Sequence, residues 1–173
     1  LLNKLVIVNG PHPDVFINEY NTNPKQKAAS SYMAFFTTPG SEVVLKANEH
    51  KLLIDAFGSA LSDEDKAEYR KLFAASDLVK MLNWYRANLD TTAGTIAAAN
   101  ITIAVPTLVA WGMKDSALLA GNLNGLDKYV QDLKIQHFPT ATHWVPHEQP
   151  AAVAKAIADF TAGLPIAATA TES

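Results

Sequence analysis

The sequence predicts an α/β protein, in which three parallel strands form part of a doubly wound sheet that is interrupted by a large helical insert. Three apolar runs predict the strands, and the first run is rich in β-branched residues and closed by a Gly-Pro pair. About ninety residues of helical pattern separate the first run from the second, far more than an ordinary crossover needs. The predicted strands are residues 4–9, 107–111 and 133–138.

Helix signals divide the rest of the chain. An Asn-Pro pair at the start, acid-rich first turns and apolar residues at helical spacing set most of the boundaries. The clearest helix is the last one, which has Pro150 in its first turn and Gly163 at its end. The expected helices are 24–38, 42–46, 51–57, 62–73, 76–89, 118–131 and 150–163.

This pattern indicates four segments. Residues 1–13 form a core strand, 14–99 the helical insert, 100–165 a core with two loops that bear polar residues, and 166–173 a tail without periodicity. Three parallel strands make a poor independent sheet, because both of its edges stay open and both faces need cover. We therefore expect the chain to be a fragment of a larger doubly wound sheet that is interrupted by the helical insert.

Composition excludes several classes of function. A net charge of −3 with scattered Lys and Arg predicts no nucleic-acid partner. The apolar run at the N-terminus is too short for a membrane span. The absence of cysteine leaves no thiolate nucleophile and favours a cytoplasmic location over secretion. The chain contains no glycine-rich phosphate loop, so no cofactor is predicted. Pro146 lies between His143 and His147 and argues against a helical zinc motif.

Asp115 and His143 are the candidate catalytic residues. Each follows a predicted strand, and carboxyl ends of parallel strands meet at the edge of the sheet where ligands bind. An acid there can orient a histidine, whose second ring nitrogen then takes a proton from water or a hydroxyl. The alternative is that each is an ordinary loop residue, but their placement after successive strands favours the catalytic interpretation.

These residues lie in segments that resemble the α/β-hydrolase family, and within it the epoxide hydrolase and haloalkane dehalogenase branch. Val105–Asp115 is similar to the acid strand of that branch, and Thr142–Pro150 to its histidine loop and final helix. Asn9–Pro13 is similar to the exit from the core strand into its cap. The resemblance implies the C-terminal part of a doubly wound hydrolase core with a helical cap, the N-terminal part of that core being absent. Gly-x-Ser-x-Gly, the nucleophile elbow of serine members, does not occur in the chain.

Tyr32 and Tyr85 lie in segments that resemble the two cap segments supplying a tyrosine in epoxide hydrolases. A phenol with a pKa near ~10 stays protonated at neutral pH and can donate to an epoxide oxygen as charge develops. The alternative is that both tyrosines pack on apolar helix faces. The resemblance implies a small apolar substrate such as an epoxide, and a nucleophilic aspartate in the N-terminal half, on another chain or in other sequence.

Other reactions on the same fold remain open. A haloalkane or haloacid dehalogenase, or a serine esterase, would use the same acid–histidine pair with a different nucleophile or leaving group. A non-catalytic hydrolase fragment that binds a small apolar ligand or a partner protein is the third possibility.

Overall fold

The computed structural model describes residues 2–89 and 100–163 of the chain. The tail expected at 166–173 and the end of the insert at 90–99 lie outside the described residues. The chain divides into two compact units: unit 1 comprises Leu1–Ala29 and Ala97–Ser173, and unit 2 comprises Ser30–Ile96.

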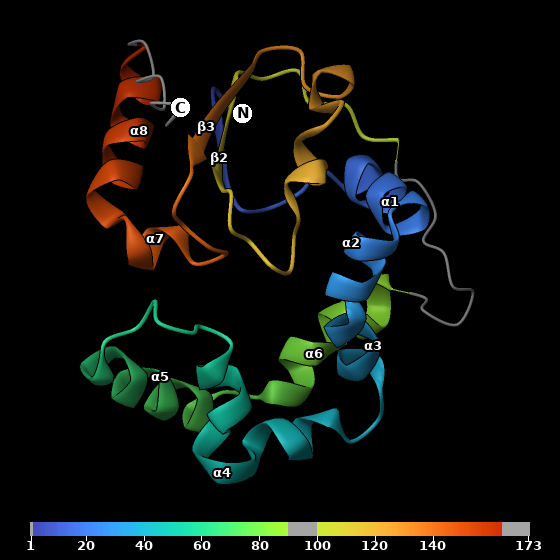
Figure 1. The fold of residues 1–173 in the computed structure, drawn as a ribbon, viewed down its shortest axis with the longest axis vertical. Helices are drawn as coiled ribbons and strands as arrows, with labels where there is room; N and C mark the ends of the chain where they lie inside the picture. The colour runs from blue at the N-terminus through green and yellow to red at the C-terminus, as the bar shows by residue number, and fades with distance from the viewer. Residues whose placement is uncertain (1, 90–99, 164–173) are drawn as a thin grey trace. The chain divides into compact units, whose positions relative to one another are not determined.

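Unit 1 is built on a parallel sheet of three strands in the order β1-β2-β3 (Figure 1). Leu5 of β1 lies opposite Thr107 of β2, which in turn lies opposite Leu133 of β3. Every residue of β2 is buried, as a strand covered on both faces requires. The strands are β1 (Leu5–Val8), β2 (Thr107–Gly112) and β3 (Leu133–Phe138), so all three predicted strands are confirmed.

Helix α8 (Pro150–Ala162) covers one face of this sheet (Figure 1). It follows the short helix α7 (Val145–Glu148), and Gly163 ends it with an N–H that bonds to two carbonyls of the last turn. Its apolar stripe meets alternate residues of β1 and β2, because successive side chains of a strand point to opposite faces. The side chains in this layer are Val6, Val8, Leu108, Ala110, Val153, Ala156, Ile157 and Phe160.

The other side of the sheet carries α1 (Pro13–Thr22), α2 (Pro24–Ala29) and two 3-10 turns (Figure 1). The turns are η1 (Ala120–Leu123) and η2 (Leu126–Lys128), so the helix predicted over residues 118–131 is wrong.

Two local features prevent that helix. The side-chain amide of Asn122 donates to the Leu119 carbonyl at 2.8 Å, and such local bonds compete with the backbone ladder. Gly125 takes a left-handed φ of 76°, which a helix interior does not contain.

The regular elements among the described residues of unit 2 are all helices. It contains α3 (Ser31–Thr37), α4 (Ser41–Asp55), α5 (Asp63–Ala75) and α6 (Leu78–Asn88). Helix α4 is two helical pieces across a kink, since residues 47–50 have non-helical backbone angles. The separate helices predicted at 42–46 and 51–57 are therefore close to the observed pieces.

The helix predicted over 24–38 is interrupted at Ser30, where the chain passes from unit 1 to unit 2. Helix α1 and helix α2, which fall in the segment expected to form the insert, thus group with the sheet.

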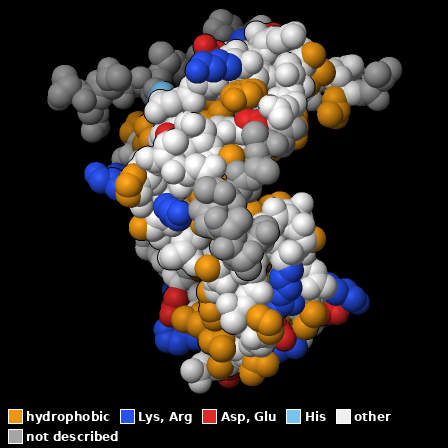
Figure 2. All heavy atoms as spheres, turned by 90° about the vertical axis from the view of Figure 1, so that its right-hand side faces the viewer, with side chains coloured by type: hydrophobic (Ala, Val, Ile, Leu, Met, Phe, Trp, Pro, Cys, Tyr) orange, Lys and Arg blue, Asp and Glu red, His pale blue; other side chains and the backbone are white. Residues whose placement is uncertain are grey.

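The core of unit 2 is a cluster of leucine and phenylalanine side chains from all four helices. Leu45, Leu78 and Leu82 are its buried members, with Phe35, Phe36, Leu53 and Phe73 packed against them. Outside this core, the surface of these helices mixes hydrophobic and charged side chains (Figure 2). None of the described helices is long and apolar enough to cross a membrane.

Phe160 offers a test of the layer between α8 and the sheet. The ring is 2% exposed and packs on Leu108 and Ala156, so Phe160→Ala should lower the free energy of unfolding by about 3–5 kcal/mol. Phe160→Leu should cost less, because more of the volume stays filled. Denaturant unfolding measures both, with Leu72→Ala, at a site 52% exposed, as a control expected within about 0.5 kcal/mol. A loss no larger than that of the control would contradict the packing.

Candidate active site

Two loops at the carboxyl edge of the sheet hold the candidate active site. Asp115 follows β2 after a turn in which its N–H donates to the Gly112 carbonyl at 3.1 Å. His143 follows β3 after a turn in which the Ala141 N–H donates to the Phe138 carbonyl at 3.2 Å. Because β2 and β3 are parallel neighbours, the two loops leave the sheet at the same edge.

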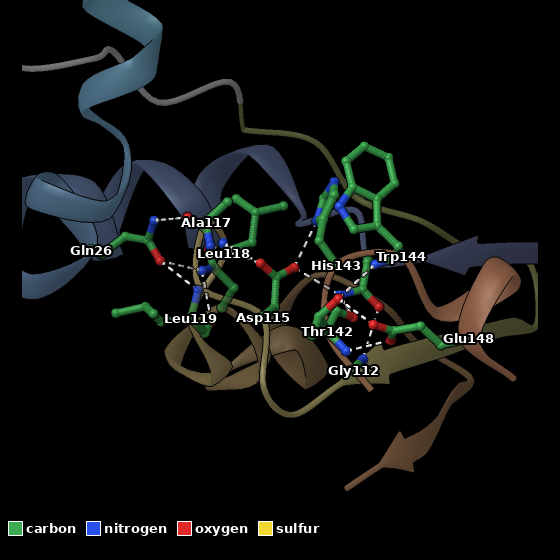
Figure 3. Close-up of polar contacts among 12 residues, drawn as sticks. Gln26, Gly112, Asp115, Ala117, Leu118, Leu119, Thr142, His143, Trp144 and Glu148 are labelled. Atoms are coloured by element: carbon green, nitrogen blue, oxygen red, sulfur yellow. Dashed lines mark hydrogen bonds and ion pairs between the residues drawn. The ribbon is translucent and has the colours of Figure 1, made fainter. Parts of the chain in front are cut away.

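The structure brings Asp115 and His143 into direct contact. Asp115 Oδ2 lies 2.7 Å from His143 Nδ1, and Figure 3 shows the two side chains pointing toward each other. Asp115 is 5% exposed, whereas the side chain of His143 is 35% exposed. A carboxylate only accepts hydrogen bonds, so Nδ1 carries the proton and Nε2 is left as the basic atom. The pair can therefore act as a general base with an oriented ring.

Four donors surround the Asp115 carboxylate. Oδ1 accepts the backbone N–H groups of Ala117 and Leu118 at 2.8 and 2.9 Å. Oδ2 accepts the His143 ring and the side-chain amide of Asn9, each at 2.7 Å. Burial alone would raise the pKa of Asp115, but the hydrogen bonds from His143, Leu118 and Asn9 and the charge of His143 outweigh it, and the pKa lies below its ordinary value. The acid is therefore ionised at neutral pH.

The histidine loop is closed by a second carboxylate. Glu148, in α7, accepts the Thr142 N–H at 2.6 Å and the Thr142 hydroxyl at 2.7 Å (Figure 3). The Thr142 hydroxyl oxygen in turn accepts the N–H of Trp144 at 3.4 Å. These bonds fix the backbone on both sides of His143, so the orientation of the ring does not depend on Asp115 alone.

Gly112 lets the end of β2 pass against the histidine loop. A Cβ at this position would collide with the carbonyl oxygens of Thr142 and Ala141. A residue without a side chain is needed wherever two backbones approach so closely. The Gly112 backbone is thus part of the reason that the acid and histidine loops meet.

A buried amide holds the segment that follows Asp115. Gln26 of α2 is fully buried, donates to the Ala117 carbonyl at 2.9 Å and accepts the Leu119 N–H at 2.9 Å (Figure 3). Its Oε1 also accepts the amide of Asn122 at 2.8 Å. A side-chain amide has both a donor and an acceptor, so it can bond to the backbone carbonyl and N–H groups of this loop, which would otherwise be buried without partners.

The two candidate tyrosines lie together in unit 2. Tyr32 is on α3 and Tyr85 on α6, with ring centroids 6.4 Å apart, and Phe36 lies 4.9 Å from Tyr85. Both tyrosines are half-buried, and burial raises the pKa of Tyr85, which keeps this phenol protonated. Arg86, next along α6, pairs with Glu42 of α4 at 2.8 Å and ties the two helices together. The tyrosine pair and the acid–histidine pair belong to different units of the chain.

Sequence reasoning gave no role to the residues that support the pair. Asn9 and Gln26 are polar and buried, but their partners lie about a hundred residues away, so no local pattern reveals them. Glu148 is six residues from Thr142, and its position at a predicted helix start is the only local signal.

Two other features of unit 1 lie apart from the acid–histidine pair. A small apolar cavity of about 200 Å³ borders Ile7, His12, Val109 and Val130, and neither Asp115 nor His143 lines it. His12 is buried, caps α1 through a bond from the Asp14 N–H and stacks on a tyrosine ring. No cluster of metal-binding side chains occurs among residues 2–89 and 100–163.

Comparison with known proteins finds related sequences. The chain is 31% identical to the AB hydrolase superfamily protein YfhM of Bacillus subtilis (strain 168), over 92% of this chain and 57% of that protein. It is 30% identical to epoxide hydrolase 3 of Xenopus tropicalis, over 92% of this chain and 46% of that protein. The chain thus spans about half the length of these curated relatives. No model of a protein family matches it.

Solved structures agree. A Bacillus megaterium epoxide hydrolase in complex with an inhibitor superposes with a TM-score of 0.83 at 26% identity, over 93% of this chain and 61% of that one. An epoxide hydrolase from metagenomes of hot environments superposes with a TM-score of 0.77 at 31% identity, over 93% and 59% of the two chains.

The fold and its relatives define the class of this protein. The chain has the α/β-hydrolase fold, and its three parallel strands and helices match the C-terminal part of epoxide hydrolases of that fold. The fold class predicted from the sequence is confirmed.

Asp115→Asn tests the electrostatics of the pair through stability. Because the folded-state pKa of Asp115 is lowered, its ionised form stabilises the fold fully above the ordinary value of 3.8 and loses that effect as the pH falls toward the folded pKa. We expect Asp115→Asn to cost about 1–3 kcal/mol at neutral pH and progressively less below pH ~4. Urea unfolding across this pH range measures the difference.

The matched control is Asp127→Asn, since Asp127 is an exposed aspartate of the same unit. It should leave both the stability and its pH dependence close to those of the unsubstituted chain. An Asp115→Asn penalty of the same size at pH 3 and pH 7 would contradict the lowered pKa.

Proposed function

We propose that this chain is the cap and C-terminal core of an epoxide hydrolase that converts a small apolar epoxide to a diol. A nucleophilic aspartate in an N-terminal half, outside this chain, attacks the substrate. Tyr32 and Tyr85 donate to the epoxide oxygen, and His143 with Asp115 activates water. The observation that carries the proposal is that one chain holds an ordered acid–histidine pair and a pair of neighbouring tyrosines, of which Tyr85 has a raised pKa.

The first chemical step opens the epoxide ring. The aspartate forms an ester bond to one ring carbon as the bond from that carbon to the ring oxygen breaks. The ring oxygen leaves as an alkoxide and takes a proton from one phenol, while the other phenol donates a hydrogen bond. Two donors aimed at one oxygen stabilise the charge that develops there.

The second step hydrolyses the ester. His143 Nε2 takes a proton from water, the hydroxide adds to the ester carbonyl, and the leaving alkoxide takes the proton from His143. The diol departs, and the carboxylic acid returns its proton to the phenolate through solvent. Asp115 stabilises the imidazolium that forms between these proton transfers.

The tyrosine pair separates this proposal from its rivals on the same fold. A halide leaves as a stable anion and needs no proton, and an ester substrate develops its charge at an acyl oxygen rather than at a ring oxygen. Burial raises the pKa of Tyr85, so this phenol keeps its proton at neutral pH and can give it to an alkoxide leaving group, which must be protonated. We therefore favour the epoxide over a halide or an ester as the substrate.

Tyr32→Phe combined with Tyr85→Phe tests the role of the phenols in the complete hydrolase. We expect diol formation to fall by at least about 10²-fold, the usual effect of removing a donor to a developing oxyanion. Chromatographic assay of the diol measures it, with Tyr69→Phe in α5 as the control that keeps turnover. Unchanged turnover in the double variant would remove the two tyrosines from the mechanism.

His143→Gln tests the second step separately. The variant should still form the ester but hydrolyse it slowly, so a covalent adduct of the epoxide with the enzyme should accumulate. Mass spectrometry of the denatured protein detects the added mass. Halide release with a haloalkane, or turnover by the 173-residue chain without its N-terminal half, would instead overturn the proposal.

A further inference from the structure

We propose that Asn9 is a positioning residue, whose side-chain amide holds the Asp115 carboxylate in the orientation that bonds His143. This inference rests on the proposed function, since it concerns the same acid–histidine pair. Asn9 lies directly after β1, on neither of the two loops that carry the pair.

Asn9 connects the end of β1 to β2 and to the loops that follow β2 and β3. Its N–H donates to the Ala110 carbonyl of β2 at 2.9 Å, and its Oδ1 accepts the Gly112 N–H at 2.8 Å. Its Nδ2 donates to Asp115 Oδ2 at 2.7 Å and lies 3.4 Å from the Thr142 carbonyl in the histidine loop. The residue is 5% exposed, so water does not compete for these bonds.

The geometry requires an amide at this position. Because Oδ1 is held by the Gly112 N–H, the NH₂ group must face the Asp115 carboxylate, and a flipped amide would set oxygen against oxygen. Asn9 has a left-handed φ of 43°, which asparagine tolerates better than most residues. The position thus needs a side-chain donor, a side-chain acceptor and a residue that tolerates a left-handed backbone, and asparagine meets all three requirements.

Asn9 and His143 bond to the same carboxylate oxygen. The backbone N–H groups of Ala117 and Leu118 bond to the other oxygen, Oδ1. By themselves they would let the carboxylate rotate about Oδ1, which would move Oδ2 away from His143. The amide of Asn9 fixes that rotation and adds a donor that stabilises the charged form. The effect on catalysis passes through Asp115, and Asn9 need not touch the substrate.

A two-step reaction lets this role be separated from a merely structural one. The acid–histidine pair acts in ester hydrolysis, so loss of Asn9 should slow that step and spare ester formation. The values of kcat and KM should then fall together, with kcat/KM preserved. A folding defect would instead lower the amount of active enzyme, which reduces apparent kcat and leaves KM unchanged.

Asn9→Gly in the complete hydrolase is the direct test, because glycine accepts the left-handed φ and only the amide is lost. We expect kcat to fall by about 10- to 100-fold, the worth of one hydrogen bond to a charged group, together with KM. The covalent ester should accumulate in rapidly quenched samples analysed by mass spectrometry.

Asn48→Gly is the matched control. Asn48 also has a left-handed φ, of 49°, but it is exposed and lies in unit 2. The same substitution there should leave kcat and KM unchanged. In a variant that already carries Asp115→Asn, Asn9→Gly should lower kcat little further, because both substitutions remove the same interaction.

Asn9→Asp is the second variant if Asn9→Gly does not fold. It keeps the shape and the acceptor for Gly112 but sets a carboxylate against Asp115, so the two share a proton and their apparent pKa rises. The acid limb of the kcat profile should move to higher pH.

The outcomes separate the two proposals. Wild-type kinetics in Asn9→Gly, or an unmoved acid limb in Asn9→Asp, would overturn the role of Asn9 while leaving epoxide hydrolysis intact. Absence of diol formation by the unsubstituted hydrolase would instead overturn the proposed function.

Discussion

The buried carboxylate of Asp115 is the constraint on which the rest of the site depends. An ion taken out of water needs compensation from several donors, and Asp115 has four within 2.9 Å. Those donors come from the residues that follow it, from the end of β1 and from the loop after β3. One charge therefore determines the path of three segments that are far apart in the sequence.

The supporting contacts arrange the histidine loop before any substrate binds. Two hydrogen bonds from Thr142 to Glu148 hold that loop from one side, and the absence of a side chain at Gly112 lets β2 approach it from the other. Gln26 holds the loop that follows Asp115 through its hydrogen bonds to Ala117 and Leu119. Rigid supports of this kind reduce the reorganisation that a proton transfer otherwise requires.

The helical unit carries the two tyrosines of the proposed mechanism. In the proposed mechanism a phenol must keep its proton until it donates to the alkoxide, and partial burial raises the pKa of Tyr85. In the aromatic cluster of Tyr32, Phe36 and Tyr85 the packing and donor interpretations are compatible, because the ring of a tyrosine can pack while its hydroxyl makes a hydrogen bond.

The sequence by itself determined the three strands, the last helix and the candidate pair Asp115 and His143, because strand ends and helix caps are local patterns with direct physical causes. It also predicted a helix over residues 118–131, where side-chain bonds to the backbone and a left-handed glycine prevent one. Only the tertiary structure decided that Asn9, Gln26 and Glu148 support the pair. Their roles depend on donors and acceptors meeting across long stretches of chain, and hydrophobic periodicity carries no information about which polar groups will meet.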